Sequence, residues 1–393
     1  MNALDGLNVV DLSHAIAGPT CTNMLAELGA DVIKIEPPQG DGFRHYTEHG
    51  GAPLLSIPFA SINAGKRSVV LDLKTPAGIG LLWQLVERAD ILVENFRPGV
   101  LARLGMDFAA LHARNPRLIL VSITGFGQSG PLANRGAYDH IAQAMSGFAM
   151  LNATAEGPQK IGIPIIDGFT GYLATIGLLA ALRRRDHGGV GEHVDVAMLD
   201  AALKLVNTTV SVHSYTGRTP GGTGNRGFRL VATSEFYPTA EGWIALGANN
   251  QPQVEALLRV LGHPEMIDDP RFSSHEARVE HYGVVRQWLT ETLANWRAAD
   301  LEARLADARV PVAMLRTVGE IAQHPHVRQR GTLHPVTLPD WDRPLDVVGP
   351  GFSVEMQAQP KVPVLGADTD EVLAELGLTA SDLATLRQAG VIQ

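Results

Sequence analysis

Short apolar runs alternate with helix-like segments through the first third of the chain. The apolar runs are LNVVDLS, DVIKIE, SVVLDL, DILVEN and RLILVSITGFG, and helical spacing appears in PTCTNMLAELG and GIGLLWQLVERA. Strands of a parallel sheet that is covered on both faces contain Val, Ile and Leu without strict alternation. The pattern therefore predicts a βαβα order with a mostly parallel sheet flanked by helices, which is an α/β fold.

The remaining pattern predicts a second, smaller domain and a return to the first. From Tyr138 to about Asn207 the signal is helical, and GYLATIGLLAALRRR is apolar around nearly its whole circumference, as in a buried helix. A Gly-rich tract, TGRTPGGTGNRGF, interrupts the chain there, and its residues 220–227 are a candidate lid. SEFYPTAEGWIALGANN then predicts a hairpin with a Glu-Gly turn, and helical patterns follow at 251–262, 276–294 and 299–308.

The predicted domains follow from these changes of pattern. They are a large α/β domain over residues 1–215, a Gly-rich linker over 216–230, a small α+β domain over 231–318, and a return segment over 319–393 that completes the large domain.

Composition excludes several classes of function. The 393 residues are 45% hydrophobic and 19% charged, and the formal charge of -9 comes without a basic stripe, which argues against nucleic acid as a partner. The N-terminus carries acids where a signal peptide has a basic region, and no stretch approaches the ~18 uninterrupted apolar residues of a membrane span. The single cysteine, Cys21, cannot form an internal disulfide and is expected to be a buried structural thiol. We expect a cytoplasmic protein without membrane partners.

Two features superficially resemble dinucleotide binding. Gly125–Gly130 matches G-x-G-x-x-G after a strand, but Pro131 and irregular sequence follow where a helix must begin, so a simple glycine turn is the better interpretation. Glu36 ends the second predicted strand, yet the turn before it contains only Gly18. No close set of metal ligands appears among the 14 histidines.

Asp167, in KIGIPIIDGFTGYLATIG, stands where an extended apolar segment meets the buried helix. An N-cap is one interpretation, since Asp is among the best capping residues and stabilises a helix by ~1 kcal/mol. A functional carboxylate, held ionised by the helix N-terminus, is the other. Basic residues near predicted strand ends add a candidate phosphate site, namely Lys66, Arg67, Lys74, Arg97 and Arg103.

Several stretches together resemble the class III CoA-transferase family, which includes formyl-CoA and carnitine CoA-transferases and the related 2-methylacyl-CoA racemases. They are GLNVVDLSHAIAGP, LAELGADVIKIEPPQGD, GKRSVVLDLKT, ADILVENFRPGVLARLG, NPRLILVSITGFGQSGP, AYDHIAQAMSG, PIIDGFTG and PVLGADTDEVLAELG. The resemblance covers nearly the whole chain. It implies a doubly wound, Rossmann-like large domain, a small α+β domain, an interlocked homodimer, acyl-CoA and a small carboxylic acid as substrates, and neither a metal nor a tightly bound cofactor.

The resemblance also implies roles for individual residues. Asp167 matches the catalytic aspartate, which would form an aspartyl anhydride and then an aspartyl-CoA thioester. Ile16 stands where the formyl-CoA enzyme has a glutamine, and Pro37 where it has an arginine. The implied CoA contacts are Ala15, Ile16, Ala17, Leu71, Lys74, Asn95, Phe96, Arg97, Arg103, Ala137 and Tyr138.

Two other functions stay open on the same fold. Racemases of this superfamily have a Gly-His-Asp run where this chain has Ala137, Tyr138 and Asp139, so one proton-transfer group is missing and transfer is preferred over racemisation. A catalytically silent acyl-CoA-binding protein is the alternative outside enzymes.

Overall fold

The chain folds into two units, each with its own core. The structure is a computed structural model that describes residues 2–46, 54–222, 224–226, 230–338, 341, 343–353 and 360–393. The large unit comprises residues 1–148, 160–219 and 329–393, and the small unit comprises residues 149–159 and 220–328. The tract that the sequence suggested as a lid, 220–227, lies partly outside the described residues.

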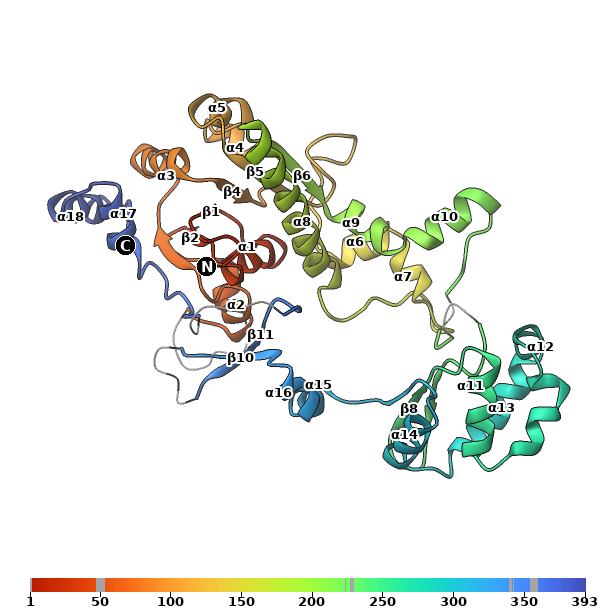
Figure 1. The fold of residues 1–393 in the computed structure, drawn as a ribbon. Coiled ribbons are helices and arrows are strands. Elements are labelled where there is room, and N and C mark those ends of the chain that lie inside the picture. The colour runs from red at the N-terminus through yellow and green to blue at the C-terminus, as the bar shows by residue number, and fades with distance from the viewer. Residues whose placement is uncertain are drawn as a thin grey trace. The chain divides into compact units, whose positions relative to one another are not determined.

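A six-stranded parallel sheet forms the centre of the large unit, in the order β3-β2-β1-β4-β5-β6 (Figure 1). This is the strand order of the Rossmann fold, in which strands are added to one side of β1 up to β3 and to its other side from β4 onward. The strands are β1 (Asn8–Asp11), β2 (Asp31–Glu36), β3 (Arg67–Val70), β4 (Ile91–Glu94), β5 (Ile119–Thr124) and β6 (His193–Ala197).

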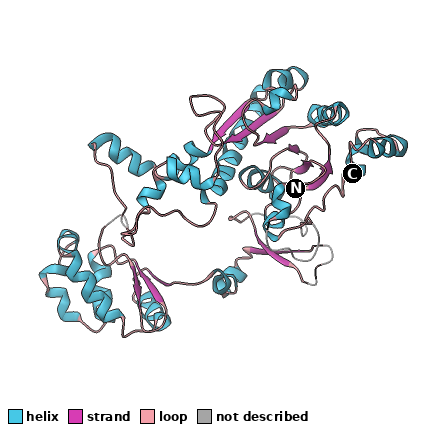
Figure 2. Cartoon of the chain, turned by 180° about the vertical axis from the view of Figure 1, so that it is seen from behind, coloured by secondary structure: helices cyan, strands magenta, loops and turns pink. Residues whose placement is uncertain are grey.

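Helices cover both faces of this sheet, as Figure 2 shows. Successive strand residues point to opposite faces, so Val9 packs under α1 (Ala17–Glu27) and α8 (Ile165–Gly188), whereas Val10 faces the other core. That second core contains α3 (Pro76–Arg88), α4 (Val100–Arg103) and α5 (Phe108–Arg114). The α/β architecture with a parallel sheet is confirmed.

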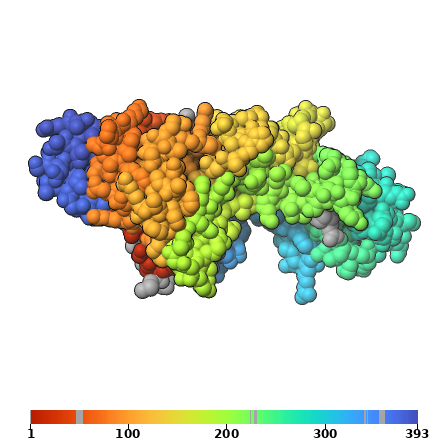
Figure 3. All heavy atoms as spheres, turned by 90° about the horizontal axis from the view of Figure 1, so that it is seen from above, coloured from red at the N-terminus to blue at the C-terminus, as the bar shows by residue number. Residues whose placement is uncertain are grey.

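The C-terminal residues complete the second core. Val372 of α17 (Thr369–Glu375) and Leu383 of α18 (Ala380–Gln388) are buried against α3, and Figure 3 shows this blue segment beside the orange residues that precede β4. The C-terminal segment is also hydrogen-bonded to β3: the Asp368 carboxylate accepts from the Ser68 amide at 2.7 Å.

The small unit contains a three-stranded antiparallel sheet in the order β7-β8-β9. The predicted hairpin is confirmed: β7 (Phe236–Pro238) and β8 (Trp243–Leu246) flank a turn in which Gly242 has a φ of 87°. Helices lie where the apolar spacing placed them, except that the segment predicted at 276–294 is two helices that meet at His281. The other elements of this part are β9 (Val312–Met314), α11 (Gln251–Val260), α12 (His275–Glu280), α13 (Tyr282–Leu293), α14 (Ala298–Asp307) and α15 (Val318–Ala322).

One strand was missing from the sequence-based prediction. We expected the segment from Tyr138 to Asn207 to be helical, but β6 lies within it. This strand ends the sheet and its residues are mostly half-buried, so it lacks the long apolar run that marks an interior strand. The remaining elements of the chain are α2 (Ile57–Ser61), α6 (Asp139–Met145), α7 (Phe148–Leu151), α9 (Met198–Leu205), α10 (Asn207–Thr216), α16 (Pro325–Gln329), β10 (Leu333–Val336) and β11 (Leu345–Val348).

Helix α8 packs unusually close to α1. A Cβ atom added at Gly171 would lie 2.6 Å from the Ala17 carbonyl oxygen and 2.7 Å from Thr20 Cβ, so only glycine allows this approach. Among the described helices, α8 alone is long and apolar enough to cross a membrane, but that composition equally suits a core helix, and its buried face packs against α1 and the sheet.

Candidate active site at the carboxyl edge of the sheet

The reversal of strand order places two loops side by side at the carboxyl edge of the sheet. The loop after β1 leads to α1 on one face, and the loop after β4 leads to α4 on the other. Asn95 joins them: its Oδ1 accepts from the His14 amide at 2.9 Å and its Nδ2 donates to the His14 carbonyl at 2.8 Å. Ligands of doubly wound sheets bind at such a reversal point.

The turn over residues 13–16 is fixed at each step by buried side chains. The Asp11 carboxylate accepts from the Ser13 amide at 2.9 Å, and Lys34 Nζ donates to the Ser13 carbonyl at 2.7 Å. The Asp41 carboxylate accepts from the Ala15 amide at 3.2 Å, although Ala15 has a φ of 63°, which an alanine rarely adopts. Buried side chains of the protein therefore fix the shape of this turn, including its strained residue, which favours a binding role.

Two basic residues of the predicted phosphate site have structural roles instead. Lys66 is buried, and its ammonium donates to the Asp11 carboxylate at 3.1 Å and to Thr22 Oγ1 at 2.7 Å. Arg67 pairs with Asp31 and Glu375. Both residues lie at the amino end of β3, the opposite edge of the sheet, and their ion pairs do not support a role in the phosphate site predicted with Lys74, Arg97 and Arg103. Burial lowers the pKa of Lys66 to about 8, against the opposing effect of Asp11.

The other basic candidates follow the carboxyl ends of strands. Lys74 follows β3, and Arg97 and Arg103 follow β4; all three side chains are exposed. Arg97 also reaches the 136–138 loop, because a Cβ atom at Gly136 would lie 3.5 Å from its guanidinium. Among the described residues, no carboxylate pairs with these three side chains, so they can meet an anionic ligand at this edge.

The apolar candidates divide into exposed and buried positions. Ala15 and Tyr138 are exposed, and the Phe96 ring lies 5.9 Å from that of His14. Ile16 and Ala17 begin α1, and Ala137 packs against Gly125. Leu71 is completely buried in the second core, so only its backbone could meet a ligand.

Asp167 lies in the first turn of α8, but it does not cap the helix. Pro164 occupies the cap position, and the carboxylate of Asp139, at the start of α6, accepts from the amides of Ile166 at 2.6 Å and Asp167 at 3.1 Å. The N-cap interpretation of Asp167 is therefore wrong: a side chain distant in sequence satisfies these amides. Within the described residues, no group donates a hydrogen bond to the Asp167 carboxylate.

The electrostatic surroundings of Asp167 also differ from the expectation. Burial, and secondarily the negative charge of Asp139, raise the pKa of Asp167 from 3.8 to about 7. We expected the helix N-terminus to hold this carboxyl group ionised, but its amides are already bonded to Asp139. With this pKa, the carboxyl group exists in both its protonated and its ionised form near neutral pH, which is common at catalytic sites.

Asp167 and the turn at residues 13–16 lie at the same edge of the sheet. Gly171, which contacts Ala17 and Thr20 of α1, lies four residues after Asp167. Residues four apart lie one turn from each other on the same side of a helix. The second turn of α8 therefore packs on the first turn of α1. Asp167 lies one helical turn before this contact, on the side toward the start of α1, where Ile16 and Ala17 are proposed CoA contacts.

Two ionisable groups at this edge were missed from the sequence. Glu94 ends β4 beside a cavity of about 100 Å³ that Arg97 and His193 also line, and burial raises its pKa to about 7. His14 lies on the turn before α1, and burial together with the charge of Lys34 lowers its pKa. An acid that ends an apolar strand was the available signal for Glu94, whereas nothing local distinguished His14.

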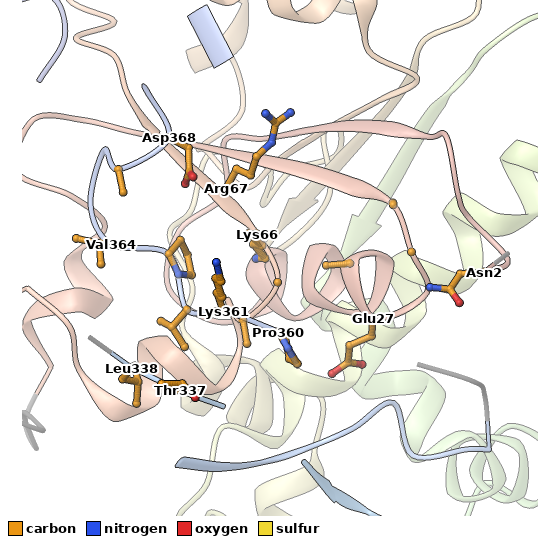
Figure 4. Close-up of a pocket in the computed structure, with 18 residues that line it drawn as sticks. Asn2, Glu27, Lys66, Arg67, Thr337, Leu338, Pro360, Lys361, Val364 and Asp368 are labelled. Carbon is orange, nitrogen blue, oxygen red and sulfur yellow. The ribbon is translucent and has the colours of Figure 1, made fainter. Parts of the chain in front are cut away.

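A larger cavity, of about 760 Å³, opens at the opposite edge of the sheet (Figure 4). Its lining includes Asn2 before β1, Glu27 at the end of α1 and Lys361 from the C-terminal segment. None of the proposed CoA contacts and neither Asp139 nor Asp167 lines it. We therefore place the candidate active site at the carboxyl edge.

The structure does not support dinucleotide binding at either of the two sequence features that resemble it. No helix begins after the Gly125–Gly130 run before α6 starts at Asp139. Glu36 is buried and paired with Arg44 at 2.7 Å, and although burial alone raises its pKa, Arg44 lowers it to about 2. The expectation for Cys21 is confirmed, because the thiol is fully buried and burial raises its pKa to about 12.

Comparison with known proteins identifies the family. The family model for CoA-transferase family III matches residues 4–369. The chain belongs to the family III CoA-transferases. A succinyl-CoA–D-citramalate CoA-transferase of Chloroflexus aurantiacus is 35% identical over 99% of this chain and 98% of its own length. An acetyl-CoA:oxalate CoA-transferase of Acetobacter aceti is 37% identical over 86% of this chain and 90% of its own.

Solved structures agree with this assignment. A CAIB/BAIF family protein from Brucella suis has a TM-score of 0.86 and 32% identity, covering 96% of this chain and 100% of that chain. This family III CoA-transferase is therefore an enzyme, and CoA thioesters are the substrates of its class. The silent-binder alternative loses its support, since the chain matches the CoA-transferase family model and the two relatives named above are CoA-transferases.

Proposed function

We propose that this enzyme moves CoA from a donor acyl-CoA to a small carboxylic acid, with Asp167 as the nucleophile. One observation carries the proposal: a partly buried carboxyl group without a hydrogen-bond donor among the described residues lies in the first turn of α8, one turn before the contact of α8 with the start of α1. An uncommitted carboxylate at the ligand edge of the sheet suits nucleophilic attack better than a structural role.

The proposed reaction forms two covalent intermediates. The Asp167 carboxylate attacks the acyl-CoA carbonyl, which forms a mixed anhydride and releases CoA thiolate. The thiolate attacks the aspartyl carbonyl, which forms an aspartyl-CoA thioester and releases the donor acid. The acceptor carboxylate then attacks that thioester, again releasing thiolate, which finally attacks the acceptor carbonyl and regenerates Asp167. Covalent catalysis of this kind divides one difficult exchange into several easier steps.

The residues at the carboxyl edge would bind CoA. We propose that the amides at the start of α1 and the loop after β4 contact the thioester end, through Ala15, Ile16, Ala17, Asn95 and Phe96. Exposed Lys74, Arg97 and Arg103 would meet the phosphates, since helix starts and basic side chains both favour anions. Leu71, Ala137 and Tyr138 complete the proposed contacts, Leu71 through its backbone.

The names of the relatives suggest the substrate class. Those relatives act on succinyl-CoA with D-citramalate and on acetyl-CoA with oxalate. We propose succinyl-CoA or acetyl-CoA as donor and a small dicarboxylic acid as acceptor. A panel of such acids with each donor, followed by chromatography of the CoA esters, tests this; thioester formation with none of them would contradict it.

Variants of Asp167 test the proposed nucleophile. Asp167→Asn keeps the shape of the side chain but removes the attacking oxygen, so transfer should fall to background. Wild-type enzyme mixed with donor alone should carry CoA on the peptide that contains Asp167, by mass spectrometry, and the variant should carry none. Deuterium exchange at the donor α-carbon without an adduct would favour racemisation instead.

We also propose a cytoplasmic homodimer. Apolar side chains on α8, α9 and α10 are exposed in the single chain, including Ile176, Leu203, Val212 and Tyr215. A patch of this kind on consecutive helices indicates a protein interface, and a second copy is the occupant that the family resemblance implies. Light scattering of the purified enzyme should give twice the chain mass; a monomer would contradict the proposal.

A further inference from the structure

Asp139 is a buried carboxylate at the start of α6 with all its hydrogen bonds directed at α8 and its own helix. It is 9% exposed. Its Oδ2 accepts from the backbone amides of Ile166 at 2.6 Å and Asp167 at 3.1 Å. Amides in the first turn of a helix have no partner within the helix, so an external acceptor both satisfies and orients them. Because the Asp167 amide belongs to the proposed nucleophile itself, Asp139 fixes the backbone from which that side chain projects.

A second buried side chain holds Asp139 in this position. Gln143, one turn later on α6, donates from Nε2 to Asp139 Oδ1 at 2.5 Å, and its Oε1 accepts from the Ile161 amide at 2.9 Å. Gln143 is fully buried. The two side chains therefore tie α6 to both ends of the segment 161–167, which leads into α8.

We propose that Asp139 is a positioning residue for the transfer reaction, which aims the Asp167 carboxylate by holding the first turn of α8 through two backbone hydrogen bonds. The inference rests on the proposed role of Asp167. A direct chemical role for Asp139 does not fit its geometry, since both its oxygens already accept hydrogen bonds and the residue is buried.

The same contact has an electrostatic consequence. The α8 amides that could favour the ionised form of Asp167 are bonded to Asp139, and the Asp139 charge further disfavours it. Of the ionisable groups on the described parts of α1, α6, α8 and α9, Asp139 is the one whose charge shifts the pKa of Asp167. Removing that charge should lower the pKa of Asp167 and extend activity to more acidic pH.

Three variants distinguish the effect of the Asp139 hydrogen bonds from the effect of its charge and from a general loss of stability. Asp139→Asn removes the charge but keeps an oxygen that can accept from the α8 amides. The new side-chain amide nitrogen then faces the side-chain nitrogen of Gln143. Asp139→Ala removes both the acceptor and the charge. Asp107→Ala is the matched control, because Asp107 caps α5 through the Ala110 amide at 2.8 Å, away from Asp167.

Steady-state kinetics over a range of pH give the first test. Asp139→Ala should lower kcat by roughly ten- to a hundredfold with a smaller change in KM for acyl-CoA, since misplacing a reacting group costs about that much. Asp139→Asn should recover most of kcat, and the acid limb of its kcat/KM profile should move to lower pH. An unchanged kcat in Asp139→Ala, or an unmoved acid limb in Asp139→Asn, would overturn the inference.

Hydrogen exchange gives a test that does not depend on activity. In a peptide covering Ile166 and Asp167, amide exchange should quicken in Asp139→Ala and stay closer to wild type in Asp139→Asn and Asp107→Ala. Equal protection in all four proteins would overturn the inference even if every variant lost activity. If Asp167→Asn retained transfer activity, the proposed function would fail, and the exchange result would still report separately on the contact.

Discussion

Replacing Asp167 by Asn should stabilise the protein above neutral pH, because the ionised carboxylate is held in a site that disfavours its charge. Asp167 is partly buried, no described residue donates a hydrogen bond to its carboxylate, and Asp139 adds a like charge. Asn has the shape of the protonated acid and cannot ionise. The two proteins should therefore have similar stability at acidic pH and differ as Asp167 ionises.

The size of the effect follows from the pKa. Folding raises the pKa of Asp167 from 3.8 to about 7. The folded state thus binds more protons than the unfolded state between these values, so wild-type stability falls as pH rises through this window and stays reduced above it. At ~1.4 kcal/mol per pH unit the full effect is about 4 kcal/mol, and about 2–4 kcal/mol is expected once partial solvation is allowed for.

Thermal unfolding of both proteins at about pH 5 and about pH 8 measures the part of this difference that develops above pH 5, roughly 2 of the ~3.2 pH units. Each kcal/mol corresponds to ~2–4 °C in a unit of this size. Asp200→Asn is the matched control, because Asp200 is an exposed aspartate in the first turn of α9 and should show no such widening. A Tm difference between Asp167→Asn and wild type that stays constant between the two pH values would refute the reasoning.

Three further predictions concern residues that hold the backbone around the candidate site. Lys66→Met should lower the unfolding free energy by about 3–5 kcal/mol, because it leaves a buried aspartate unpaired; a loss below ~1 kcal/mol in urea titration would contradict this. Asn95→Ala should free the turn before α1 and raise KM for acyl-CoA severalfold, and an unchanged KM would argue against a binding role for that turn. Gly171→Ala should cost about 1–3 kcal/mol through its clash with α1, whereas Gly168→Ala, with open space around its Cβ position, should be neutral or stabilising; equal Tm values would contradict the close packing.

The interior of the fold was predictable because its strands are buried on both faces. The runs that became β1 to β5 are nearly continuous in Val, Ile and Leu, as parallel strands require. The edge strand β6 is mostly half-buried, so its HVDVA sequence carried no comparable signal. Strand order could not come from local pattern, because it depends on contacts between distant segments, such as that of β1 with β4.

The site was predictable in part. Asp167 was recognised through the surrounding motifs, but its environment depends on Asp139, a partner that no local spacing reveals. Lys66 was misplaced because basic residues at the start and at the end of a strand look alike in sequence, whereas only the end of the strand lies at the ligand edge. Asn95 was expected to contact CoA, and the structure adds its bonds to the backbone of His14.

The fate of the acceptor oxygen tests the central claim most directly. In the proposed reaction the acceptor carboxylate gives one oxygen to the anhydride, and thiolate attack on the acceptor carbonyl leaves that oxygen on Asp167. Turnover with an acceptor acid labelled with heavy oxygen, followed by mass spectrometry of the peptides, should place the label in the peptide containing Asp167 and at that residue. Product formation over many turnovers with an unlabelled Asp167 would contradict a covalent role for this aspartate.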